Sequence, residues 1–458
     1  MSSSESKPAY FLVSLGCPKN LVDSERMAGL LRLEGYEMVA EQERADFALV
    51  NTCGFIAEAR HESYGVIEEM LEKKRRGMLR GVIVAGCLAE WDREALLSRY
   101  PEIDQLVGVF AREEIAAAAS RLLEGRAEPR ALFRPAPSRP LADDGRLRVT
   151  LPHVGYLKIA EGCDRRCTFC TIPRIRGRYA SKPIEQIVAE ARGLADDGVR
   201  ELILVAQDTS YYGRDLYGAP RLAELLGELD AVEGLVWIRP MYLYPHHITD
   251  ELIERIAHAR RVLPYLDLPL QHISDRVLER MRRGVTRAET ERLIERLRRR
   301  IDGLVLRTTL MSGFPGETEA EFRELLEFVR RARFERLGVF AYSPEPGTPA
   351  ERMDPAVPEP IGRARRDRLM AAQQEIARQY NRAQVGRRRD VLVDGPVPGQ
   401  PHAYVGRTMA DAPEIDGAVY VTGEDLAPGR IVPTEIVDFR GYDLIGVPYD
   451  RADREDGS

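Results

Sequence analysis

The chain has 458 residues, of which 44% are hydrophobic and 31% charged, a composition typical of a globular protein with two or three domains. No apolar run approaches the roughly 18 residues that a membrane-spanning helix needs, and residues 1–7 lack the apolar core of a signal peptide, so we expect a cytoplasmic protein without a membrane partner. Its 67 Lys and Arg residues against 73 Asp and Glu give a net charge of −6, which argues weakly against a protein that chiefly coats nucleic acid.

The first part of the chain, residues 8–127, alternates short apolar segments with helical patterns. Strands are expected at residues 10–14, 47–51, 82–85 and 105–108. Each segment is followed by a turn or helix signal, which is the pattern of a parallel sheet in an α/β domain. Ligands bind such sheets at the carboxyl ends of the strands.

Three further parts follow. Four prolines interrupt residues 128–147, which predicts a linker. Residues 148–383 alternate strand and helix patterns again, with strands expected at 155–160, 201–206, 235–240, 265–269, 305–311 and 337–342. Six such units predict a parallel barrel, complete or partial. In residues 384–452, short β-rich runs between Gly and Pro turns predict a small all-β barrel.

Three cysteines lie directly after the first expected barrel strand, with the spacing C-x3-C-x2-C at Cys163, Cys167 and Cys170. A short loop with this spacing can wrap three thiolates around one face of an iron–sulfur cubane. Ferredoxins that only carry electrons close the cluster with four cysteines, whereas three leave one iron open to a small molecule. A structural zinc site is the alternative, but such sites usually have four ligands, and the nearest histidine, His153, is ten residues away.

The other three cysteines, Cys17, Cys53 and Cys87, each follow an expected strand of the N-terminal sheet. Because the carboxyl ends of parallel strands meet at one edge, the three thiols could converge on a second cluster. A glycine adjoins each cysteine and permits close approach of the backbone to an inorganic group. The alternative is that each cysteine is a small buried hydrophobic residue.

The C-x3-C-x2-C loop after the first strand of a barrel resembles the radical S-adenosylmethionine (SAM) superfamily. This resemblance implies a [4Fe–4S] cluster whose open iron binds SAM, and a 5′-deoxyadenosyl radical that abstracts hydrogen from an unactivated carbon. A C–H bond without an acidic proton offers nothing to a general base, so the cofactor supplies the hard chemistry, and we assign no residue as a catalytic base. Phe169 matches the aromatic residue that lies beside the adenine.

Further SAM contacts are implied by the same resemblance. Gly313, Pro315 and Gly316 follow the fifth strand, in a segment similar to the one that packs against adenine. Gln207 and Asp208 end the second strand, where the superfamily often contacts the methionyl amine. An ordinary turn is the alternative for residues 313–316.

Two other residues near the expected strands have more than one possible role. Arg307 lies within the fifth strand and either points toward a carboxylate in the barrel or forms a structural salt bridge. His272, after the fourth strand, is similarly ambiguous.

Two groups of three cysteines on one chain resemble the methylthiotransferase family, and the resemblance covers the whole chain, with a C-terminal barrel similar to TRAM domains. It implies two [4Fe–4S] clusters, one of them auxiliary and held by the N-terminal cysteines. It also implies that SAM serves as both radical source and methyl donor, and that sulfur is delivered at the auxiliary cluster. An electron donor protein and a sulfur donor would complete the reaction.

Two branches of the family compete. One modifies an adenosine of transfer RNA, and the other modifies the β-carbon of an aspartate in protein twelve of the small ribosomal subunit. The string Leu-Gly-Cys-Pro-Lys-Asn at residues 15–20 resembles the ribosomal branch, because the transfer-RNA branch usually carries a Gln-Met-Asn-type string after the cysteine. Residues 241–245, 266–272 and 413–417 also resemble it, whereas Lys182 stands where we would expect Arg.

Charge provides a separate discriminator. Residues 384–458 contain 8 Arg and 14 Asp or Glu, a net charge of −6, so the rest of the chain is neutral. A barrel that grips RNA should be basic, whereas an acidic barrel would attract a basic ribosomal protein, unless the acidity serves solubility alone. We therefore expect a basic ribosomal protein as substrate, docked by the acidic barrel. Transfer RNA is the alternative substrate, and a non-catalytic iron–sulfur or RNA-binding protein is an alternative of another class.

Overall fold

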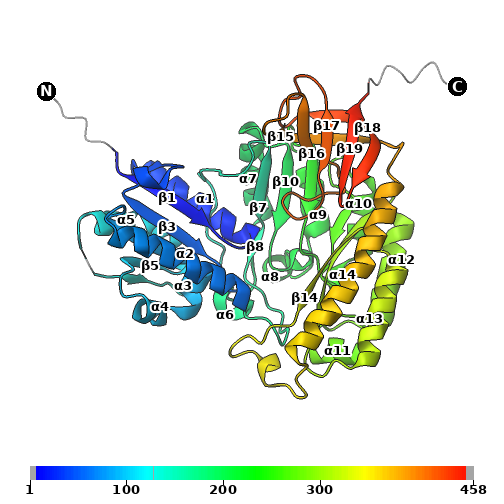
Figure 1. Cartoon of the computed structure of the whole chain (residues 1–458), viewed down its shortest axis with the longest axis horizontal. Coiled ribbons are helices and arrows are strands. Elements are labelled where there is room, and N and C mark those ends of the chain that lie inside the picture. Colours follow the sequence, from blue (N-terminus) through cyan, green and yellow to red (C-terminus); the bar gives the residue numbers. More distant parts are fainter. Residues whose placement is uncertain (1–6, 127, 450–458) are drawn as a thin grey trace.

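The computed structural model describes residues 7–126 and 128–449. In Figure 1 the N-terminal part of the chain, in blue, lies to the left of a larger central domain, and the C-terminal strands, in orange and red, lie at the top of that domain. Within the described ranges, no helix is both long and apolar enough to cross a membrane.

The N-terminal domain is built on a parallel sheet, as the sequence predicted, but the sheet has six strands where four were expected. In spatial order these are β2 (Glu37–Met38), β1 (Ala9–Ser14), β3 (Phe47–Thr52), β4 (Gly81–Gly86), β5 (Gln105–Val107) and β6 (Ala131–Leu132). The short edge strands β2 and β6 were not predicted, because two residues carry no periodic pattern of their own. Strand β6 shows that the proline-rich residues 128–147 do more than connect: they extend this sheet.

Helices cover both faces of the sheet, which explains why β3 and β4 are buried along their whole length and mostly apolar. One face packs against α1 (Pro18–Leu33) and α5 (Ile115–Leu123). The other packs against α2 (Ala57–Arg75), α3 (Cys87–Asp92) and α4 (Glu94–Arg99).

The central domain contains the six parallel strands that the sequence predicted, arranged as a partial barrel. They are β7 (Val154–Lys158), β10 (Glu201–Val205), β11 (Trp237–Pro240), β12 (Tyr265–Asp267), β13 (Val305–Ser312) and β14 (Arg336–Ala341). They pair as β11-β10-β7 and β12-β13-β14, and a parallel bridge between Ile238 and Val262 joins the two halves. Among the described residues, β7 and β14 do not pair, so the arc stays open.

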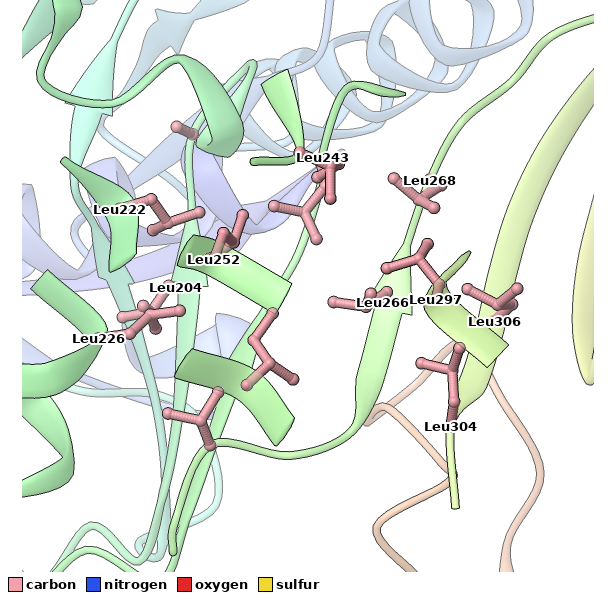
Figure 2. Close-up of a cluster of buried hydrophobic side chains, with 14 of the residues drawn as sticks. Leu204, Leu222, Leu226, Leu243, Leu252, Leu266, Leu268, Leu297, Leu304 and Leu306 are labelled. Carbon is pink, nitrogen blue, oxygen red and sulfur yellow. The ribbon is translucent and has the colours of Figure 1, made fainter. Parts of the chain in front are cut away.

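The helices of this domain pack their leucines against the strands (Figure 2). Leu204, Leu266 and Leu306 of the strands meet Leu226, Leu252 and Leu297 of the helices. The main helices are α7 (Ile184–Asp196), α9 (Leu222–Asp230), α10 (Asp250–His258), α12 (Arg287–Arg300), α13 (Glu319–Ala332) and α14 (Glu359–Arg382). This core fixes the strands, so the loops at their carboxyl ends are held on a rigid support.

The C-terminal domain is a closed barrel of five strands. Its strands are β15 (Arg388–Pro396), β16 (Ala403–Arg407), β17 (Val419–Thr422), β18 (Ile431–Arg440) and β19 (Asp443–Pro448). Strands β18 and β19 pair as an antiparallel hairpin.

The loop between β16 and β17 meets the amino ends of the central strands. The Tyr265 hydroxyl donates to Asp416 Oδ2 at 2.6 Å, and Arg239 donates to the Met409 carbonyl at 2.9 Å. Arg336 pairs with Asp411, and Arg407 of β16 pairs with Glu201 of β10. The C-terminal barrel is therefore anchored at the end of the central barrel remote from the carboxyl ends of its strands.

Candidate active site

The three N-terminal cysteines lie at the carboxyl ends of neighbouring strands. Cys17 follows β1 and caps α1, Cys53 follows β3, and Cys87 begins α3 directly after β4. The turns that carry them touch: a Cβ atom built on Gly16 would lie 2.8 Å from Cys53 Sγ, and one built on Gly54 would lie 2.8 Å from the Cys87 carbonyl oxygen. Parallel-sheet topology thus brings together three thiols that are far apart in the sequence.

The surroundings of these thiols are cationic. Burial raises the pKa of the Cys17 thiol, but Lys19, Arg176 and nearby backbone N–H groups outweigh burial, so that the pKa lies below its ordinary value. Burial raises the pKa of Cys87 to about 12, although the Arg176 guanidinium lies 3.2 Å from its sulfur. Thiolates are the metal-binding form of cysteine, and cations and N–H donors of this kind stabilise them.

Cys163, Cys167 and Cys170 lie on the loop between β8 (Ala160–Glu161) and α6 (Ile172–Arg176). The backbone N–H of Arg165 donates to Cys163 Sγ at 3.4 Å, and Arg283 donates to Cys167 Sγ at 3.5 Å. After burial, the charge of Cys167 is the next largest cause of the raised pKa of Cys170. The thiols are therefore mutual neighbours.

Both groups of thiols suit an iron–sulfur cluster in their donor chemistry. Each offers three free cysteines, and each receives a charge-assisted hydrogen bond from an arginine on one sulfur. Within the described residues, no group of three or more His, Cys, Asp or Glu side chains is placed to hold a single metal ion.

The segment at residues 313–316 lies beside Phe169. The Phe169 and Phe314 rings meet edge to face with centroids 6.3 Å apart. Gly313 has a positive φ, and a Cβ atom there would lie 2.7 Å from the Gly362 Cα of α14, so packing against that helix is one reason for this glycine. The Pro315 carbonyl accepts a hydrogen bond from Arg280 at 3.0 Å, and Arg280 also lies beside Gly316.

Gln207 and Asp208 differ in the hydrogen bonds that their side chains make. Asp208 is buried and accepts hydrogen bonds from Arg165 Nε at 2.9 Å, from Ser210 Oγ at 2.7 Å and from the Tyr211 backbone at 3.1 Å. Through Arg165 it holds the loop that carries Cys163. Gln207 is half-buried, and its side chain makes no hydrogen bond within the described part of the chain.

Comparison with known proteins agrees with this geometry. Residues 157–329 match the radical SAM superfamily, residues 9–108 match the uncharacterized protein family UPF0004, and residues 385–448 match the TRAM domain. The chain is 47% identical over 437 residues to the ribosomal protein uS12 methylthiotransferase RimO of Anaeromyxobacter sp. (strain K), covering 95% of this chain and 92% of that protein. It is 48% identical to the RimO of Pelotomaculum thermopropionicum, covering 95% and 98%.

The chain belongs to the radical SAM methylthiotransferase family. Solved structures support the fold alone. The radical SAM methyltransferase TsrM from Kitasatospora setae has 18% identity and a TM-score of 0.54, covering 73% of each chain. As a radical SAM methylthiotransferase, this enzyme employs a [4Fe–4S] cluster and SAM.

A buried ionic network in this methylthiotransferase was not predicted from the sequence. Asp23 of α1 accepts from Lys158 at 2.7 Å and pairs with Arg176 at 2.9 Å and with Arg112. Glu161 pairs with Lys158 at 2.9 Å and with Arg176 at 3.1 Å. Despite their burial, the surrounding cations hold the pKa values of Asp23 and Glu161 below their usual range.

The network extends into residues 128–147. Asp143 is fully buried and pairs with Arg112 and Lys182, each at 2.7 Å. Lys182, which stands where we expected Arg, also pairs with Glu190 at 2.8 Å. The sequence contained no signal for this network because its members are single charged residues from distant segments. They fix the N-terminal domain against the central domain, and Arg176 brings the network to Cys87.

Proposed function

We propose that this enzyme methylthiolates ribosomal protein uS12 at the β-carbon of an aspartate. SAM would serve as radical source and methyl donor, sulfur would be delivered at an auxiliary cluster, and an electron donor protein and a sulfur donor would complete the reaction. The observation that carries the proposal is the pair of three-cysteine groups, one in each of two domains that meet in the buried contact between Arg176 and Cys87. Relatives 44–48% identical over about 95% of the chain act on uS12 according to their names.

Under this proposal, Cys163, Cys167 and Cys170 would hold the radical-generating cluster, and Cys17, Cys53 and Cys87 the auxiliary cluster. When bound, the clusters and SAM supply the one-electron chemistry that an unactivated C–H bond requires. The chain's own residues shape the site.

Phe169 and residues 313–316 would offer SAM an apolar wall, in which the Phe314 ring holds the Phe169 ring in place. Gln207 has an uncommitted side chain to offer SAM. Asp208 orients the cysteine loop through Arg165 and would contact SAM only with the part of its carboxylate not used there.

Docking of uS12 by the C-terminal barrel is the second element of the proposal. The acidity of this barrel is partly internal, because Asp394, Asp411 and Asp416 are engaged with His153, Arg336 and Tyr265 of the central domain. Glu424 and Asp425, between β17 and β18, are exposed and offer charge to a basic partner. Opposite charges attract more weakly as salt rises.

A competition assay tests the substrate. Anaerobically reconstituted enzyme receives SAM, a reductant, a sulfur source, a uS12 peptide carrying the target aspartate, and transfer RNA. We expect a methylthio mass gain on the peptide alone. A gain on transfer RNA would assign the enzyme to the other branch, and absence of 5′-deoxyadenosine would indicate a non-catalytic protein.

A charge-reversal experiment tests docking. E424K/D425K should weaken binding of full-length uS12 and reduce its dependence on salt. The matched control is E34K/E37K, which reverses two exposed acidic residues of the N-terminal domain. Equal binding by both double variants would contradict docking through the C-terminal barrel.

A further inference from the structure

Lys19 is a buried cation without a carboxylate partner. It is 5% exposed and lies in the first turn of α1, two residues after Cys17, whose thiolate charge stabilises it. Within the described residues, its ammonium group makes no ion pair with a carboxylate and no hydrogen bond. The other buried lysines differ: Lys158 lies within 2.9 Å of two carboxylates, and so does Lys182. A buried ammonium group without hydrogen-bond acceptors is costly, so a function is expected for it.

The contact that Lys19 does make crosses between domains. Its Nζ atom lies 3.5 Å from the centroid of the Tyr242 ring, and Tyr242 follows β11 at the carboxyl end of the central strands. A cation over an aromatic face is stabilised by about 0.5–2 kcal/mol, which leaves the three N–H donors of the ammonium free for an acceptor. Lys19 therefore lies where the turn that carries Cys17 contacts the carboxyl ends of the central strands.

Tyr242 is held firmly in this position. Its φ of +59° is left-handed although it is not glycine, and such strain persists only where the surroundings enforce it, often at ligand sites. Its backbone N–H donates to Asp267 Oδ2 at 3.1 Å, and Arg307 pairs with the same carboxylate at 2.8 Å. Asp267 is thus already neutralised by Arg307, so it does not serve as the missing partner of Lys19.

These observations leave the Lys19 ammonium group with free donors for an anion from outside the chain. Resting on the function proposed above, we propose that the Lys19 ammonium binds the side-chain carboxylate of the substrate aspartate and thereby selects and orients it for reaction at the adjacent β-carbon. The charge-assisted hydrogen bond would form in a site shielded from water, where such bonds are strongest. Lys19 is then a specificity-determining residue, because an amide in place of the carboxylate would leave the ammonium without its counter-charge.

Peptide binding tests this role without relying on turnover. Reconstituted full-length enzyme is titrated with two fluorescent uS12 peptides that carry Asp or Asn at the target position. We expect wild type to bind the Asp peptide about tenfold more tightly, a modest value for a shielded ion pair. Lys19→Met should bind both peptides at the weaker level, and Lys19→Arg should keep part of the preference.

Lys73→Met, which removes a lysine on the surface of α2, is the matched control and should behave as wild type. Iron content of each variant is measured in parallel. If Lys19→Met loses iron, the test rests on the ratio of the affinities of Lys19→Arg for the Asp and Asn peptides. An unchanged Asp-to-Asn ratio in Lys19→Met, or no preference in wild type, would overturn the proposal. Failure of wild type to methylthiolate the Asp peptide would instead overturn the proposed function.

Discussion

The guanidinium of Arg176, which belongs to the radical SAM domain, lies 3.2 Å from the sulfur of Cys87 in the N-terminal domain. The same guanidinium pairs with Asp23 at 2.9 Å and with Glu161 at 3.1 Å, and Arg176 is only 1% exposed. The surroundings of the N-terminal thiols are therefore completed by the neighbouring domain, and the charge that faces Cys87 depends on how the two domains are docked.

Arg176→Met should destabilise the enzyme strongly. The substitution leaves Asp23 and Glu161 buried with fewer cations, and removing one partner of a buried pair costs about 3–5 kcal/mol. Urea unfolding followed by fluorescence of Trp91 and Trp237, one in each domain, measures the change. Arg178→Met is the control, because Arg178 is nearby in sequence but its side chain is 92% exposed. Equal unfolding midpoints for the two variants would contradict a structural role of the network.

Iron content should divide between the two cysteine groups. Wild type is expected to bind about eight irons per chain, as two cubane clusters require. Replacing Cys163, Cys167 and Cys170 by Ala should leave about half of this iron and abolish SAM cleavage. Replacing the three N-terminal cysteines by Ala should leave the other half and preserve SAM cleavage. Full iron loading of either triple variant would show that its cysteines bind no cluster.

Gly16→Ala should impair the N-terminal cluster selectively. Gly16 has a φ of +88°, and a Cβ atom there would lie 2.7 Å from Cys53 Cβ, so the two cysteine turns must separate. Gly35 provides the control, because its φ of +87° is nearly the same but a Cβ atom there meets nothing within 4 Å. We expect Gly16→Ala to lose iron while Gly35→Ala retains it. Iron loss of the same size in both would indicate backbone strain alone.

His272 should make the protein less stable in mild acid. The residue is 1% exposed, burial lowers its pKa from 6.5 to about 3, and its Nδ1 atom accepts a hydrogen bond from the Ser274 backbone at 3.0 Å. Since the unfolded chain takes up a proton below pH 6.5 and the folded chain does not, stability is complete above that pH and falls toward pH 3, by on the order of 2 kcal/mol at pH 5.

Urea midpoints at pH 7.5 and pH 5 measure this effect. His272→Gln should reduce the difference between the two midpoints, whereas His258→Gln, at an exposed position on α10, should not. If both variants follow the wild-type pH dependence, His272 does not contribute to it.

The cysteine positions could be predicted because each lies immediately after a recognisable strand, and parallel topology alone then brings Cys17, Cys53 and Cys87 to one edge. The ionic partners of Arg176 could not be predicted in this way. Asp23 and Glu161 are isolated charges in different domains, and no local pattern relates them. The contact between Lys19 and Tyr242 could not be predicted for the same reason.

Counting charged residues gave the net charge of the C-terminal part but not the positions of its carboxylates in the structure. The sequence showed an acidic C-terminal part, and the structure places Asp411 and Asp416 against Arg336 and Tyr265 rather than toward solvent. Residues 413–417, which resembled the ribosomal branch, belong to the loop that meets the central strands. Composition does not distinguish a carboxylate at such a contact from one at the surface. Four of the acidic residues counted lie at 450–458, outside the described residues.

The anchoring of the C-terminal barrel limits how it can be exchanged between relatives. Its five strands form a closed barrel, so the fold alone would suggest a domain that can be replaced by that of any relative. A graft without Asp411 would remove the carboxylate that pairs with the buried Arg336. One without Arg407 would leave the buried Glu201 with Arg239 as its remaining partner. Removing one partner of a buried ion pair costs several kcal/mol. The barrel and the amino ends of the central strands must therefore be inherited, or engineered, as a matched set.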